Sequence, residues 1–187
     1  MKKIAIIGAG MVGRAWSIVF AKKCEQVTLY DTDDKAIEDS ILLISMAAQE
    51  LYKIGLLEDD PNIILKRISG TNNIKKAIDG ASYIQESGPE NLDIKRQIFN
   101  NLDNLTNKNI PIGSSTSGIK ASLFSKGLKN PERCMVVHPV NPPSLVPLVE
   151  IVPSQFTEQR FIKSVFDLME EVGQKPILVQ KEIEGFI

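Results

Sequence analysis

KIAIIGAGMVG, residues 3–13, joins a short β-branched run to glycines spaced as G-x-G-x-x-G. The run from Lys3 to Ile7 predicts a strand, and the loop that follows opens a predicted helix from Met11 to about Lys23. A second apolar run, Val27 to Tyr30, predicts another strand, which ends on Asp31. A strand, a glycine loop, a helix and a second strand that ends in an acid form the pattern typical of a dinucleotide-binding site.

Each glycine of this loop has a distinct expected role. Gly8 permits the tight turn, Gly10 lets the backbone approach a pyrophosphate, and Gly13 lets the helix pack closely on the strand. The N-terminus of the helix supplies unpaired N–H groups and a partial positive charge for the phosphates. The loop is therefore a candidate phosphate-binding segment.

Asp31 ends the second predicted strand, where a carboxylate would accept hydrogen bonds from an adenosine ribose. A carboxylate at this position also repels a 2′-phosphate, and no arginine follows in the next few positions. We therefore expect NAD rather than NADP as the cofactor. The neighbouring Asp33 and Asp34 are interpreted differently, as a solvated acidic turn that caps the next helix.

The chain has 187 residues and a formal net charge of −1, with acidic and basic residues interspersed. This length suits one domain with a sizeable core, and the charge balance indicates neither a nucleic-acid partner nor binding to an anionic membrane surface. No segment approaches the roughly 18 apolar residues of a membrane span, and glycines interrupt the N-terminal apolar run in a way that argues against a signal peptide. Cys24 and Cys134, beside apolar runs, predict buried reduced thiols in a cytoplasmic protein.

The remaining chain continues to alternate helix and strand signals. Helices are expected over residues 37–55, 56–66, 74–79, 92–105 and 158–172, and strands over 68–71, 81–85, 110–112, 134–137, 148–152 and 177–180. This alternation predicts an α/β, Rossmann-like doubly wound fold with a mainly parallel sheet and antiparallel C-terminal strands. Segment 56–66 has two interpretations, packing against the sheet or a flap over the ligand crevice, of which packing is preferred.

In doubly wound sheets, ligands bind beyond the carboxyl ends of the strands. This rule adds three segments to the glycine loop and Asp31 as candidate site: residues 86–90, 114–117 and 138–141. The serine-rich loop has an alternative interpretation as an ordinary polar turn. Its position at a strand end makes Ser117 a candidate site residue.

His138 is the only histidine, so any imidazole chemistry must use it. If the strands on either side of Ser144 pair antiparallel about it, His138 and Glu150 lie opposite each other with Cβ atoms about 5 Å apart. The carboxylate would accept the imidazole N–H and fix its tautomer, and His138 would take a hydroxyl proton while the carbinol carbon passes hydride to a nicotinamide. Ser117 and Asn141 would orient the substrate oxygen and the carboxamide. The alternative is a structural His–Glu pair that joins two strands.

Three motifs carry a resemblance to a known family. They are GAGMVGRAW at 8–16, QESGPENLDIKR at 85–96, and HPVNPP at 138–143 with PLVE at 147–150. With them the chain resembles the 3-hydroxyacyl-CoA dehydrogenase superfamily, specifically its L-gulonate 3-dehydrogenase (lambda-crystallin-like) branch, across all 187 residues. Acyl-CoA-using relatives typically have aromatic residues after the histidine, whereas proline, valine and then N-P-P match the gulonate branch.

The resemblance implies residue roles as well as an activity. It matches cofactor-contacting positions to Met11, Val12, Asp31, Glu90 and Lys95, in addition to the loop glycines Gly8, Gly10 and Gly13. It matches the active-site serine, the catalytic histidine, its neighbouring asparagine and the acidic partner of the histidine to Ser117, His138, Asn141 and Glu150. Spacing alone would leave Glu90 as a helix-start acid and Lys95 as a solvated base. We also expect Ser117 and Asn141 to contact the cofactor.

The implied function is NAD-dependent oxidation of the 3-hydroxyl of a small hydroxy acid, such as L-gulonate. A 3-hydroxyacyl-CoA or carnitine is the alternative substrate, and a non-catalytic, crystallin-like NAD-binding protein is the alternative of another class. In this family Gly185-Phe186-Ile187 begins a G-F-x-x-N-R segment that leads into a helical C-terminal domain with an active-site asparagine. Residues 1–187 are therefore expected to be the NAD-binding domain, without the helical domain, of a protein that is a homodimer at full length.

Overall fold

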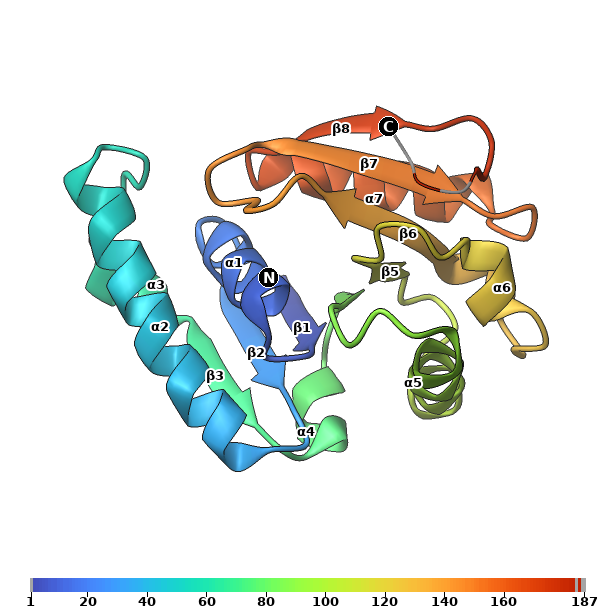
Figure 1. Ribbon diagram of the computed structural model, residues 1–187, viewed down its shortest axis with the longest axis horizontal. Coiled ribbons are helices and arrows are strands. Elements are labelled where there is room, and N and C mark those ends of the chain that lie inside the picture. The colour runs from blue at the N-terminus through green and yellow to red at the C-terminus, as the bar shows by residue number, and fades with distance from the viewer. Residues whose placement is uncertain (1, 184, 186–187) are drawn as a thin grey trace.

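The described residues of the computed structural model, 2–183 and 185, form one eight-stranded sheet with helices on both faces (Figure 1). The strand order is β3-β2-β1-β4-β5-β6-β7-β8. The strands are β1 (Lys3–Ile7), β2 (Gln26–Tyr30), β3 (Ile68–Thr71), β4 (Tyr83–Glu86), β5 (Ile112–Ser114), β6 (Cys134–Pro139), β7 (Leu148–Pro153) and β8 (Lys175–Leu178).

The direction of the strands confirms the predicted fold class. Neighbouring strands from β3 across to β6 are all parallel. Strand β7 then pairs antiparallel with β6, and β8 runs parallel to β7. The C-terminal pair therefore reverses direction, as expected, and the start of β7 lies at the same edge of the sheet as the end of β6.

Two apolar clusters fill the spaces between the sheet and its helices. One contains side chains of α1 (Met11–Ala21), α2 (Asp34–Lys53), α3 (Pro61–Lys66) and α7 (Gln159–Glu171). The other contains side chains of α4 (Ile74–Ile78), α5 (Leu92–Leu105) and α6 (Ala121–Ser125), on the opposite face. A short 3₁₀ helix, η1 (Pro131–Arg133), precedes β6. Because both faces are covered, β4 and β5 are buried along their whole length, and β1 and β6 contain continuous apolar runs without alternation.

The glycine loop is shaped by close backbone contacts. Gly8 has a φ of +116°, and a Cβ there would lie 2.5 Å from the carbonyl oxygen of Ser87. A Cβ on Gly13 would lie 2.0 Å from the carbonyl oxygen of Gly8. The expected tight turn at Gly8 and close approach at Gly13 are thus both confirmed, because neither position has room for a side chain.

Several predicted boundaries were wrong. Strand β5 begins at Ile112 rather than at residue 110, because the N–H of Ile110 closes a turn on the carbonyl of Asn107 after α5. Gly113 and Ser114 consequently belong to the strand and not to the loop after it. Strand β8 begins at Lys175, two residues before the predicted start, and the short helix α6 was not predicted.

Segment 56–66 forms a turn and then α3, which begins at Pro61 after the Asp60 cap. Leu57 and Ile64 are buried in the same cluster as α1 and α2, which favours the packing interpretation over the flap. Both cysteines are buried and unpaired, as predicted. None of the helices within the described ranges combines the length and apolar character needed to cross a bilayer. The predicted G-F-x-x-N-R start falls on residues 185–187, of which 186 and 187 lie outside the described residues.

Candidate active site

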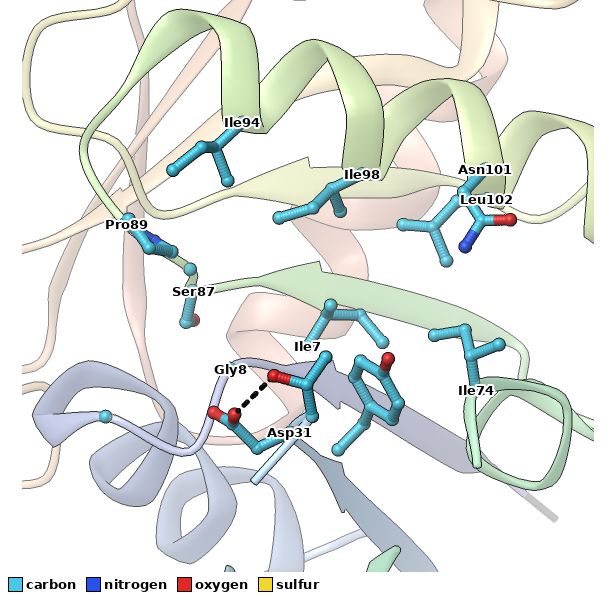
Figure 2. A pocket seen from close by; sticks show the side chains of 14 residues that line it. Ile7, Gly8, Asp31, Ile74, Ser87, Pro89, Ile94, Ile98, Asn101 and Leu102 are labelled. Atoms are coloured by element: carbon cyan, nitrogen blue, oxygen red, sulfur yellow. Dashed lines mark hydrogen bonds between the residues drawn. The ribbon is translucent and has the colours of Figure 1, made fainter. Parts of the chain in front are cut away.

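A cavity of about 590 Å³ opens beyond the carboxyl ends of β1, β2 and β4. Figure 2 shows its two walls: Gly8 and Asp31 lie on the sheet side, while Ile94, Ile98 and Asn101 project from α5. The α5 residues were missed from the sequence, although their spacing of four and three residues marks one face of a helix. The cavity combines an apolar wall with a carboxylate and backbone polar groups, as small-molecule sites commonly do.

Asp31 holds the glycine loop in place. Its Oδ2 accepts a hydrogen bond of 2.9 Å from the backbone N–H of Ala9, and Ser40 Oγ donates to the Ala9 carbonyl over 2.5 Å. A Cβ built on Gly10 would have no heavy atom of residues 2–183 and 185 within 4 Å, apart from Gly10 and its chain neighbours. The loop is therefore fixed at Ala9 and open at Gly10, which leaves room for a phosphate at the N-terminus of α1. This second role of Asp31 was not predicted.

Lys95 is buried rather than solvated, which corrects the interpretation from spacing alone. Its side chain is 1% exposed, and its Nζ donates to both carboxylate oxygens of Glu86 over 3.0 and 2.9 Å. Ser114 Oγ donates to the same carboxylate over 2.5 Å, and the N–H of Gly88 donates to it over 2.7 Å. This cluster of Lys95, Glu86 and Ser114 ties α5 to the ends of β4 and β5.

Glu90 lies beside this cluster and reaches the serine-rich loop. Its carboxylate accepts hydrogen bonds from Thr116 Oγ1 over 2.6 Å and from the N–H of Ser117 over 3.1 Å. Partial burial favours the neutral acid, but the hydrogen bond from Thr116 and the charge of Lys95 outweigh it and hold the pKa of Glu90 below its usual value. Glu90 and Ser117, both predicted site residues, are thus in direct contact.

The predicted pairing of His138 with Glu150 is confirmed. The two residues are direct partners in the antiparallel register of β6 and β7. His138 Nδ1 lies 2.5 Å from Glu150 Oε2, within hydrogen-bond distance. The Glu150 side chain is 1% exposed, whereas that of His138 is 17% exposed, so the pair presents the imidazole and buries its carboxylate partner. The catalytic role of the pair stays a prediction.

Other predicted residues lie apart from the main cavity. Asn141 is exposed just past the end of β6. Met11 is 71% exposed at the start of α1 and lines a second, mostly apolar hollow, while Val12 packs against the core. His138, near the end of β6, and Ser117, just after β5, do not line the main cavity but lie at the same edge of the sheet. The candidate site therefore extends along this edge from β2 to β6.

Fold and cavity together define the class of protein, a dinucleotide-binding α/β domain. Residues 3–183 match the family described as "3-hydroxyacyl-CoA dehydrogenase, NAD binding domain". The chain belongs to this family. The family, the predicted cofactor NAD and the resemblance to lambda-crystallin proteins are thereby confirmed.

Known relatives carry several different names. The chain is 38% identical to the mouse (Mus musculus) lambda-crystallin homolog over 98% of its own length and 58% of that protein. It is 37% identical to L-carnitine dehydrogenase from Oceanobacillus iheyensis over 100% of its length and 60% of that protein. A solved structure of 3-hydroxybutyryl-CoA dehydrogenase from Escherichia coli superposes with a TM-score of 0.93 at 27% identity, covering 100% of this chain and 39% of that chain. The chain thus spans about three fifths of the length of these curated relatives.

Proposed function

We propose that this chain is the NAD-binding domain of a dehydrogenase that oxidises the 3-hydroxyl of a small hydroxy acid, with L-gulonate as the leading substrate. The observation that carries the proposal is the hydrogen-bonded pair of His138 and Glu150 at the same strand edge as the dinucleotide cavity. A histidine whose ring is held by a buried carboxylate is suited to general acid–base catalysis.

The cavity is proposed to hold the adenosine half of the cofactor. Asp31 would accept hydrogen bonds from the ribose hydroxyls, and the open backbone at Gly10 would receive the pyrophosphate. Ile94 and Ile98 on α5 supply an apolar wall for the adenine. When bound, NAD supplies the hydride acceptor. The residues of this chain have to align the substrate and move one proton.

The proton transfer is assigned to His138. Since Nδ1 faces the Glu150 carboxylate at 2.5 Å, the neutral imidazole carries its hydrogen on Nδ1 and Nε2 is its basic nitrogen. Nε2 takes the proton of the substrate hydroxyl during oxidation and returns it during reduction. Glu150 stabilises the imidazolium that forms when Nε2 takes this proton. Ser117, held by Glu90, and Asn141 are proposed to orient the substrate oxygen and the nicotinamide carboxamide.

Two other substrates and one other class of function are supported by the named relatives. Similarity to L-carnitine dehydrogenase and to 3-hydroxybutyryl-CoA dehydrogenase makes these two substrate types the alternatives within the enzyme class. Similarity to lambda-crystallin homologs supports an NAD-binding protein without catalysis. A helical C-terminal domain and a homodimer are proposed for the full-length protein from the resemblance to the family, and the greater length of the relatives supports an additional domain.

A comparison of substrates tests the proposal. The full-length protein that contains this chain is mixed with NAD and L-gulonate, L-carnitine or 3-hydroxybutyryl-CoA, and NADH formation is followed by absorbance. We expect the highest kcat/KM for L-gulonate and a loss of turnover in His138→Gln with NADH binding retained. A higher kcat/KM for either other substrate would reassign the specificity. NADH binding without turnover of any of the three substrates would support the crystallin-like alternative.

A further inference from the structure

Beneath the main cavity, four side chains from separate elements form a connected set of hydrogen bonds. Ser115, just after β5, lies at its centre. Its Oγ is 3.2 Å from Trp16 Nε1 on α1, 2.7 Å from Gln85 Nε2 on β4 and 2.9 Å from Ser87 Oγ just after β4. Ser87 also lines the cavity, where Figure 2 shows its side chain between Pro89 and Gly8. These contacts connect the core to the proposed cofactor site.

The direction of each hydrogen bond follows from the groups in the set that can only donate or can only accept. The indole N–H of Trp16 can only donate, and the carbonyl oxygen of Val137 can only accept. Gln85 Nε2 lies 3.2 Å from that carbonyl, which identifies it as the amide nitrogen, while Gln85 Oε1 accepts from the Tyr83 hydroxyl. Gln85 Nε2 therefore also donates to Ser115.

Ser115 consequently accepts two hydrogen bonds, one from Trp16 and one from Gln85. A hydroxyl oxygen has two lone pairs, so both are occupied and Ser115 can only donate its hydrogen to Ser87. Ser87 Oγ accepts this bond and has no other side-chain hydrogen bond among residues 2–183 and 185. Its own hydrogen is left to point away from Ser115, on the side where Ser87 lines the cavity.

We infer that Ser87 is a polarised hydrogen-bond donor to the ribose–phosphate oxygens of the dinucleotide, oriented by Ser115. The inference rests on the proposed function and adds a binding residue to it. Ser87 touches the glycine loop, since its carbonyl would lie 2.5 Å from a Cβ on Gly8. A ribose or phosphate oxygen bound at the glycine loop would thus lie on the side that the Ser87 hydroxyl faces. Successive hydrogen bonds in such a chain polarise one another, which strengthens the terminal donor.

Ser87→Ala tests the donor directly. We expect NADH to bind roughly 2- to 10-fold more weakly, the effect of one lost hydrogen bond. Ser87→Asp should bind NADH more weakly than Ser87→Ala, because a carboxylate only accepts hydrogen bonds and repels phosphate. The matched control is Ser82→Ala, an exposed serine at the other end of β4 that bonds the carbonyl of Lys3. Thermal unfolding of each variant confirms that it is folded.

Ser115→Ala tests the orienting role. It should weaken NADH binding less than Ser87→Ala does. In the double variant it should cause no further loss of NADH affinity beyond that of Ser87→Ala, because the two residues act through one donor. Additive losses, an unchanged affinity in Ser87→Ala, or a Ser87→Asp variant that binds as well as the wild type would overturn the inference. Failure of the unmodified protein to bind NADH would instead contradict the proposed function, which separates the two failures.

Discussion

Asp31→Asn separates the two roles that the structure gives this carboxylate. One oxygen holds the glycine loop through the N–H of Ala9 at 2.9 Å, and the carboxylate also lines the cavity where a ribose is expected. Asparagine has nearly the same size, and its carbonyl oxygen can keep the hydrogen bond from Ala9. It loses the negative charge, and its second atom becomes an NH₂ donor. The substitution therefore removes the ribose acceptor and leaves the loop anchored.

The expected magnitude follows from the lost charged hydrogen bond. Hydrogen bonds to charged groups contribute about 1.5–3 kcal/mol, so the Kd for NADH should rise about 10- to 100-fold. NADPH should behave in the opposite way, since the variant no longer repels a 2′-phosphate at this position. The ratio of the two Kd values, NADH over NADPH, should thus rise by more than the Kd for NADH alone.

The assay is a titration of each cofactor against the fluorescence of Trp16, with calorimetry as the independent measurement. Trp16 is fully buried on α1, the helix that follows the glycine loop, so a bound reduced nicotinamide can quench it by energy transfer. Asp33→Asn is the matched control, because Asp33 caps α2 through Lys35 and does not line the cavity in the described part of the chain. If Asp31→Asn weakened NADH and NADPH equally, Asp31 would act only through the loop and the reasoning would be refuted.

Three further predictions address catalysis, the loop and stability. Glu150→Gln should lower turnover of the full-length enzyme by roughly 10²-fold with little change in the Kd for NADH, because it acts through His138; a weaker Kd with normal turnover would contradict this role. Gly10→Ala should fold normally and bind NADH poorly, whereas Gly13→Ala should lower Tm, since only the latter Cβ meets backbone at 2.0 Å. Asp103→Asn should lower the free energy of unfolding by about 3–5 kcal/mol in urea titrations, because the charge of the fully buried Arg133 loses its carboxylate partner. The control, Asp93→Asn at an exposed ion pair, should lower it by about 0–1 kcal/mol. Burial opposes ionisation of Asp103, but hydrogen bonds from Asn130 and Arg133 lower its pKa below 3.8. The stability that Asp103 contributes is therefore complete above that value and is lost as pH falls through the lower folded-state pKa. If the stability of the wild type did not fall faster with acid than that of Asp103→Asn, this account would be refuted.

The features that the sequence predicted well depend on local spacing. The glycine loop, Asp31 and the two strands around them lie within one short segment, and the register of His138 with Glu150 follows from a short connection between two strands. Each inference needed only the geometry of neighbouring elements.

The features that were missed depend on contacts between distant segments. Lys95 lies on the buried face of α5 with Phe99 and Leu102, where a lysine needs a charged partner, and that partner, Glu86, lies on the adjoining strand end. The contact of Ser87 with Ser115 requires β4 and β5 to be neighbours, and Trp16 reaches the same serine from another layer. The order of strands in the sheet, which spacing does not give, decides these contacts.

The register of β6 against β7 restricts how the loop between them, residues 140–147, can change in length. Val149 and Ile151 belong to one apolar cluster and Val152 to the other, so the two faces of β7 have different surroundings. A slip by one residue would exchange the faces and bury the Glu150 carboxylate against apolar side chains. Only insertions in this loop that preserve the register are therefore compatible with folding. A relative with a longer or shorter loop that still folds keeps the residues equivalent to His138 and Glu150 opposite each other. Selection for a stable core thus also maintains the geometry of the proposed proton transfer.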